Sequence, residues 1–204
     1  CAIELLIDVL EIIYAATQFK IDGSEIYSSY EFIAFDKSRD FDLGLYFPKS
    51  AMNIIIEDFC KNVNDDQTLH FLEDFKKSKH EGFVYIALCI YTSFPDKFKD
   101  EAYDIFLNRS VLANAPSWVQ YQAIETLKAV FPLLEDARKV ILINTILNIK
   151  DNDVKGAYST SNIQERLKYG HPIFDFDLQK GRVLNTIAYA DLKRLYPEAY
   201  QERL

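Results

Sequence analysis

Residues 82–98 read GFVYIALCIYTSFPDKF, and this stretch decides how the chain is interpreted. No charged side chain occurs from Gly82 to Phe94, and apolar residues surround the predicted helix on nearly every side. A helix of that kind packs between other helices. Pro95 ends it, because proline cannot continue a helix, yet its fixed φ suits the first turn of the next one. The stretch therefore predicts a buried helix, a proline corner and a second helix.

A second stretch follows the same plan. Residues 117–132 read SWVQYQAIETLKAVFP, and their apolar helical face consists of Ala123, Ile124, Leu127, Val130 and Phe131. Four pairs of positions align the two units at 35 to 37 residues apart: Phe83 with Trp118, Ala87 with Ala123, Phe94-Pro95 with Phe131-Pro132, and Phe106 with Leu142. A helix pair that recurs near 36 residues predicts stacked helical repeats.

The C-terminal stretch LKRLYPEAYQERL, residues 192–204, carries a third aromatic-proline corner at Tyr196-Pro197. It lies 65 residues after the second corner, and residues 151–180 lack the long apolar runs on either side. We interpret 151–180 as an insertion or connecting segment, 1–150 as helical repeats and 181–204 as the start of a further repeat. The expected fold class is all-α, with antiparallel helix pairs stacked as a short α-solenoid and an irregular insertion before the last repeat.

Caps and helix breakers predict the remaining elements. We expect a helix over 2–19 and another over 24–35, where the aromatic residues leave a strand as the alternative. Residues 36–48 are expected to form a loop. Ser50 is expected to begin a helix that runs to Val63, and Asp65 or Asp66 to cap the next one.

Both ends of the chain resemble cut ends. The helical pattern begins directly after Cys1 with no residue suited to cap it, and Pro197 suits a helix start close to the last residue. We expect a fragment of a larger protein, and a trimmed small protein is the alternative.

The chain resembles the HEAT and armadillo class of helical repeats. The resemblance rests on the helix-pair period and the three aromatic-proline corners, over roughly residues 48–150 and 181–204. Asp136 and Arg138 match the Asp and Arg that often mark the second helix of a HEAT unit, with no equivalent pair in the unit before. The resemblance implies a scaffold or recognition surface. Helical sensor regions of large bacterial signalling ATPases also look similar, although no ATPase motif occurs in this chain.

The charge balance argues against nucleic acid and membranes as partners. The formal net charge is −8, and binding to phosphate or to anionic lipid depends on Lys and Arg. The cluster Lys76, Lys77 and Lys79 is explained by a helix C-terminus, where the helix dipole favours cations. The longest uncharged apolar run, 82–94, is too short to span a bilayer.

The cysteines and histidines have structural explanations. Cys60 and Cys89 lie in apolar runs without a CxxC pair, so we expect reduced, buried thiols and a cytoplasmic protein. His70 is expected on a helix surface and His80 as a cation at a helix end. Trp118 is expected to occupy a repeat core position, with an exposed binding anchor as the alternative.

Two polar segments were weighed as chemical sites. KDNDVKG, residues 150–156, begins like a calcium loop but has Lys155 where an oxygen donor is required and Asn162 where a bidentate Glu is required. HPIFDFD places His171, Asp175 and Asp177 close together, although its alternation is typical of an extended packed segment. We therefore assign no catalytic residue, metal or cofactor.

The function expected is a non-catalytic protein-interaction or scaffold module of a larger cytosolic protein. Its partner would be another protein or the rest of its own chain, and the insertion is the predicted contact region. The candidate partner-binding residues are Tyr158, His171, Phe174, Asp175, Phe176 and Asp177. Two alternatives stay open: a sensor region of a bacterial signalling ATPase, or an enzyme on a helical scaffold that uses His171, Asp175 and Asp177.

Overall fold

The computed structural model describes residues 2–20, 27–29, 43–107, 111–112, 117–148 and 194–195. These residues are mostly helical, in α1 (Ala2–Thr17), α3 (Leu43–Lys61), α4 (Asp66–Lys77), α5 (Glu81–Ser93), α6 (Pro95–Leu107), α8 (Ser117–Val130) and α9 (Asp136–Leu147). A 3₁₀ turn, η1 (Phe131–Leu133), precedes α9, and two short strands, β1 (Gln18–Lys20) and β2 (Tyr27–Ser29), follow α1. The prediction of an all-α fold is confirmed.

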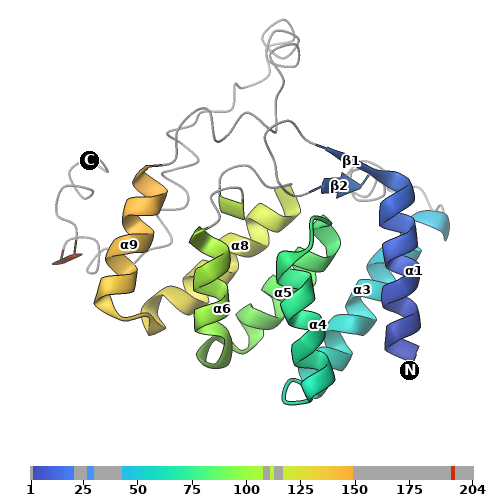
Figure 1. Cartoon of the computed structure of the whole chain (residues 1–204), viewed down its shortest axis with the longest axis horizontal. Coiled ribbons are helices and arrows are strands. Elements are labelled where there is room, and N and C mark those ends of the chain that lie inside the picture. Colours follow the sequence, from blue (N-terminus) through green and yellow to red (C-terminus); the bar gives the residue numbers. More distant parts are fainter. Residues whose placement is uncertain are drawn as a thin grey trace, which may run out of the picture.

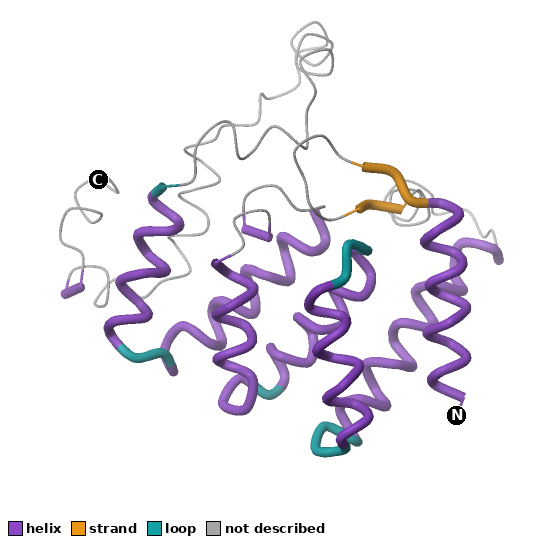
Figure 2. The backbone as a smooth tube through the Cα atoms, in the orientation of Figure 1, coloured by secondary structure: helices purple, strands orange, loops and turns teal. Residues whose placement is uncertain are grey.

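The helices succeed one another in chain order, from α1 at one end to α9 at the other (Figure 1). Helix α3 contacts α1 and α5, and α5 in turn contacts α8. Helices α4 and α6 lie in front of these and also contact α5, while α6 contacts α9 (Figure 1). Short loops join α3 to α4, α4 to α5 and α5 to α6 (Figure 2). The α-solenoid class stays a prediction for this arrangement.

Helix α5 lies at the centre of the fold, as its apolar sequence predicts. Most of its side chains are buried, among them Phe83, Ile86, Leu88, Ile90 and Tyr91. It contacts α3, α4, α6 and α8, so most of the helix surface is covered by other elements. Burial of this kind, rather than intrinsic helix propensity, stabilises most helices in proteins.

The proline corners are confirmed where the structure describes them. Pro95 is the first residue of α6, and Pro132 lies in η1 between α8 and α9. The aligned positions of the two units are buried alike: Ala87 and Ala123 are both fully buried, and so are Phe106 and Leu142. Trp118 lies in α8, but its side chain is outside the described part of the structure.

The prediction of a helix over 24–35 is wrong for residues 27–29. Strand β2 pairs antiparallel with β1, with Gln18 opposite Ser29 and Lys20 opposite Tyr27. The helix expected over 2–19 accordingly ends at Thr17, because Gln18 and Phe19 belong to β1. Pairing with a neighbouring strand outweighs the weak helical pattern of this segment.

The loop expected over 36–48 is wrong for residues 43–48, and so is the helix start at Ser50, because α3 already begins at Leu43; residues 36–42 lie outside the described part of the structure. Pro48 is the sixth residue of α3, so its missing N–H removes the intrahelical hydrogen bond to the Gly44 carbonyl, and the helix continues past it despite that loss. The later part of α3 buries Ala51, Met52, Ile55 and Phe59. That burial stabilises the whole helix, including its proline-containing first turns.

Helix α4 begins as predicted at Asp65. Its backbone is extended at the cap, and its carboxylate accepts a hydrogen bond of 2.7 Å from the backbone N–H of Gln67. Leu72 and Phe75 are buried, and Leu69 and Phe71 are half-buried. The predicted insertion at 151–180 lies outside the described residues, as does the third corner.

Candidate functional site

The six predicted partner-binding residues, Tyr158, His171, Phe174, Asp175, Phe176 and Asp177, all lie outside the described part of the structure. Residues 150–156, weighed as a calcium loop, lie outside it too. The described helices carry a different candidate surface, which sequence reasoning missed.

This surface is formed by the outward sides of α5 and α8. Its residues on α5 are Tyr85, Cys89 and Thr92, and those on α8 are Tyr121, Glu125 and Lys128; we call these six residues the tyrosine face. Each α8 residue follows its α5 counterpart by 36 positions. The α5 and α8 residues of the tyrosine face are thus related by the same 36-residue spacing as the aligned core positions. That spacing is visible in the sequence and could have indicated the tyrosine face.

The two tyrosines lie close together and remain partly accessible. Tyr121 is 64% exposed, whereas Tyr85 is half-buried. Burial first, and then the neighbouring Cys89 and Tyr121, together raise the pKa of Tyr85 to about 12. The hydroxyl of Tyr85 is therefore protonated at neutral pH, and it forms a hydrogen bond with Cys89.

The Cys89 thiol is not prepared for nucleophilic chemistry. Burial raises its pKa to about 11, which outweighs the lowering effect of its hydrogen bond with Tyr85. Reactive cysteines instead have a lowered pKa and are present as thiolates near neutral pH. Cys60 and Cys89 are free thiols, as predicted, although both are half-buried rather than fully buried.

A polar network fixes α8 against α5 beneath the tyrosine face. The Thr92 hydroxyl donates to the Leu88 carbonyl at 2.8 Å, and the Gln122 side-chain amide donates to Thr92 at 2.9 Å. The hydroxyls of Thr92 and the fully buried Thr126 are 2.8 Å apart. Because a buried polar group is stable only when hydrogen-bonded, this network specifies one register between the two helices. Tyr85 and Tyr121 are consequently held in a fixed relation.

Charges of both signs border the tyrosines. The Lys128 ammonium lies 2.5 Å from the Glu125 carboxylate, in a pair that is partly solvent-exposed. An exposed pair of this spacing contributes little to stability. The tyrosine face therefore combines aromatic rings near the N-terminal ends of α5 and α8 with charged side chains farther along α8.

A second group of polar side chains lies where α1 meets α5. The buried Tyr14 hydroxyl donates to the Met52 sulfur at 3.3 Å, and its ring lies 5.9 Å from the His80 ring. Glu81, the first residue of α5, is also buried. Burial raises the pKa of Tyr14, with the Glu81 carboxylate adding to the effect. Since a protonated Tyr14 packs tightly against Phe83, this group acts as a joint between the two helices.

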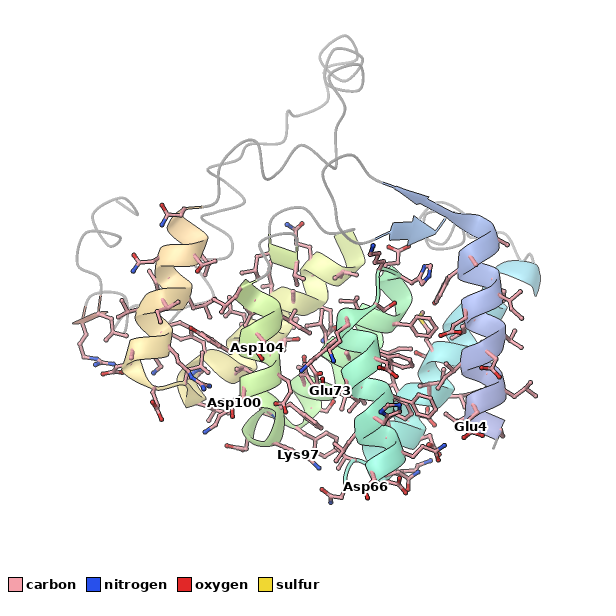
Figure 3. The ribbon with its side chains drawn as sticks, in the orientation of Figure 1. Glu4, Asp66, Glu73, Lys97, Asp100 and Asp104 are labelled. Atoms are coloured by element: carbon pink, nitrogen blue, oxygen red, sulfur yellow. The ribbon has the colours of Figure 1, made fainter. Side chains whose placement is uncertain are left out.

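The prediction that His80 is a cation at a helix end is wrong. His80 occupies the N-cap position of α5 and is half-buried, and burial lowers its pKa although Glu11 opposes the change. His70, in contrast, is exposed as predicted and lies 3.5 Å from Asp74. Lys76 and Lys77 occupy the last turn of α4, as predicted, and both pair with Glu73 (Figure 3).

Two ion pairs involve α9 and residues distant from it in the sequence. The Arg138 guanidinium donates a hydrogen bond to Asp100 of α6 (labelled in Figure 3) and lies over the Tyr103 ring. The Arg194 guanidinium donates hydrogen bonds of 2.5 and 2.9 Å to the two carboxylate oxygens of Asp136. The hydrogen bonds from Arg194 lower the pKa of Asp136. Asp100 and Asp136 are 36 residues apart, so the carboxylate does recur in the earlier unit. The sequence comparison for a complete Asp-Arg pair did not identify Asp100, because no arginine follows it at the spacing of Arg138 from Asp136.

Within the described ranges, no group of three or more His, Cys, Asp or Glu side chains could hold a metal ion, and no helix has the length and hydropathy to cross a membrane. Comparisons of the chain with protein-family models, with curated proteins and with solved structures found no match. A function for this chain must therefore be argued from its own geometry.

Proposed function

We propose that this chain is a non-catalytic protein-interaction or scaffold module, and that a partner protein binds at the tyrosine face. The observation that carries the proposal is the placement of Tyr85 and Tyr121 at equivalent positions of two helix-pair units, side by side and partly exposed. Tyrosine is enriched among residues that dominate binding energy, because it offers a large apolar ring and a hydrogen-bonding tip.

The arrangement of the helices supports this proposal. A stack of helix pairs presents one row of helices along one side, and repeat proteins of the HEAT and armadillo type use such rows as extended binding surfaces. Assignment of this chain to that class is part of the proposal. So is a cytoplasmic location, which agrees with free thiols at Cys60 and Cys89.

The kind of partner follows from the chemistry of the surface. The rings of Tyr85 and Tyr121 favour an apolar side chain, and their hydroxyls and the Glu125–Lys128 pair favour a polar rim around it. A protein segment with one apolar anchor between polar residues fits this pattern. The segment 151–180 stays a predicted second contact region.

Substitution of Tyr121 tests the proposal. The immobilised full chain should capture its partner from an extract of the source cells, and Tyr121→Ala should weaken capture by about 30-fold, as expected for an interface residue that contributes about 2 kcal/mol. Tyr121→Phe should retain most of the binding because it keeps the ring.

Ile141→Ala is the matched control, since Ile141 is 50% exposed on α9 and lies outside the tyrosine face. Circular dichroism should show unchanged helicity in all three variants. If Tyr121→Ala captures every specific partner as well as the unchanged chain does, the proposed surface is wrong.

A further inference from the structure

Helix α1 carries two apolar rows, and only one of them faces the core. In both rows the spacing alternates between three and four residues, as in the seam of a coiled coil. The inner row is Ile3, Ile7, Leu10 and Tyr14, of which the last three are buried. The second row, here called the outer row, is Ala2, Leu5, Val9, Ile12 and Ala16.

The two largest side chains of the outer row are exposed, whereas Val9 between them is half-buried. Leu5 is 64% exposed and Ile12 is 69% exposed. Helix α1 stands at one end of the succession of helices, with α3 on its inner side (Figure 1). A single exposed leucine needs no explanation, but apolar side chains at heptad spacing along one helix are typical of a docking seam.

Acidic residues accompany the outer row. Helix α1 contains Glu4, Asp8 and Glu11 and no Lys or Arg. The Glu4 carboxylate (labelled in Figure 3) accepts a hydrogen bond from the Gln67 side chain of α4. The Glu11 carboxylate lies near His80, the N-cap residue of α5, and partly offsets the lowering of the His80 pKa by burial. Asp8, which lies between them in the sequence, is exposed. One flank of the outer row is therefore negatively charged.

We propose that the outer row of α1 docks an amphipathic helix of another protein, one with apolar residues at heptad spacing and Lys or Arg along one flank. Apolar side chains at heptad spacing on α1 can pack against a second helix with the same spacing, because the side chains of the two helices interdigitate. Basic residues of the incoming helix would lie opposite Asp8 and Glu11, which fixes its register and orientation.

Charge selects this occupant over a second copy of the chain. Two copies docked antiparallel would bring their acidic flanks together, and in either orientation each chain carries a net charge of −8. Repulsion between like charges across an interface disfavours that association, so a second copy of this chain is the less favourable partner. The outer row lies on α1, away from α5 and α8, so this proposal does not rest on the tyrosine face.

Two designed peptides test the proposal. Each contains about three heptads with Leu at the first and fourth positions, flanked by Lys in one peptide and by Glu in the other. Fluorescence anisotropy should show that the full chain binds the Lys peptide at least about tenfold more tightly, with an affinity that falls as salt is added. Leu5→Asn and Ile12→Asn should each weaken this binding about tenfold.

Charge reversal gives the sharper result. Asp8→Lys combined with Glu11→Lys should reverse the preference, so that the Glu peptide binds more tightly than the Lys peptide. Ile54→Asn is the matched control, since Ile54 is 49% exposed on α3, and it should leave both affinities unchanged. Both substituted residues of the outer row are exposed, so the variants should retain their helicity.

Three outcomes would overturn the proposal. The first is failure of the Lys peptide to bind, and the second is binding that Leu5→Asn and Ile12→Asn leave unchanged. The third is a dimer, detected by analytical ultracentrifugation, that Ile12→Asn dissociates; the outer row would then bind a second copy. Since none of these variants alters Tyr85 or Tyr121, partner capture through the tyrosine face would be unaffected by any of these results.

Discussion

Gly82 is the residue on which the packing of α1 against α5 depends. A Cβ atom added at this position would overlap the Tyr14 hydroxyl and lie 2.8 Å from its Cε2 atom. Tyr14 cannot easily yield, because its ring is buried and packs edge-on against Phe83 at 5.3 Å. The glycine therefore serves close approach of two helices rather than backbone flexibility.

We predict that Gly82→Ala destabilises the protein by about 1–3 kcal/mol, the cost of overpacking a core. In an ordinary exposed helix the same change stabilises by about 1 kcal/mol, so the sign is diagnostic. Urea unfolding of Gly82→Ala, Tyr14→Ala and the double variant measures the coupling. If Gly82→Ala is equally harmful in the Tyr14→Ala background, the close contact is not the cause.

His80 makes the stability of this joint dependent on pH. Burial lowers its pKa from the ordinary 6.5, so the unfolded chain binds a proton more readily than the folded chain. Stability is therefore at its full value above the unfolded pKa and falls as the pH drops from there toward the folded pKa.

We predict that the free energy of unfolding decreases between about pH 7.5 and pH 5.5, a window above the titration of most carboxylates. His80→Asn should reduce this decrease, and the same change at the exposed His70 provides the control. Urea unfolding at both pH values measures it. An equal pH dependence in the wild type and in His80→Asn would show that His80 does not cause the decrease.

At the scale of elements, the best predicted boundaries have a local chemical cause. Asp65 caps α4 through its own carboxylate, and Pro95 begins α6 because its ring fixes φ. The wrong boundaries depend on distant contacts. Strand β2 exists through pairing with β1, and the first turns of α3 are stabilised by residues buried farther along it. Neither contact can be read from the segment alone.

We predict that Asp65→Ala destabilises the protein by about 1 kcal/mol, the usual cost of losing a helix N-cap. Asp65→Ser should recover most of this loss, because the serine hydroxyl can accept the same hydrogen bond from the Gln67 N–H. Thermal unfolding followed by circular dichroism measures both variants. Equal losses in Asp65→Ala and Asp65→Ser would assign the effect to something other than the cap.

At the scale of the whole molecule, the 36-residue period was the most informative signal in the sequence. It aligned buried positions such as Ala87 with Ala123, and these are confirmed. The same period relates Tyr85 to Tyr121 and Asp100 to Asp136, pairs that were overlooked because spacing alone does not tell an exposed repeat position from a buried one. Exposure depends on which neighbouring helices cover each side, and only the packing of α5 and α8 settles it.

The tyrosine face lies on the helices, whereas the contact region predicted at 151–180 lies outside the described residues and stays a prediction. The prediction for residues 151–180 rests on a composition that differs from that of the helical units, and composition alone says nothing about contacts. The tyrosine face instead combines accessible aromatic side chains with a hydrogen-bonded joint through Thr92 and Thr126. Rigid support of this kind reduces the entropy lost on binding.

The most direct test of the tyrosine face is site-specific photo-crosslinking in the source cells. A benzophenone amino acid placed at Tyr121 is predicted to crosslink one discrete protein, and the same protein should be recovered from position 85. Position 141, on the exposed side of α9, should give no such product. If positions 121 and 141 give the same products, or if position 121 gives none, the tyrosine face is not a partner-binding surface.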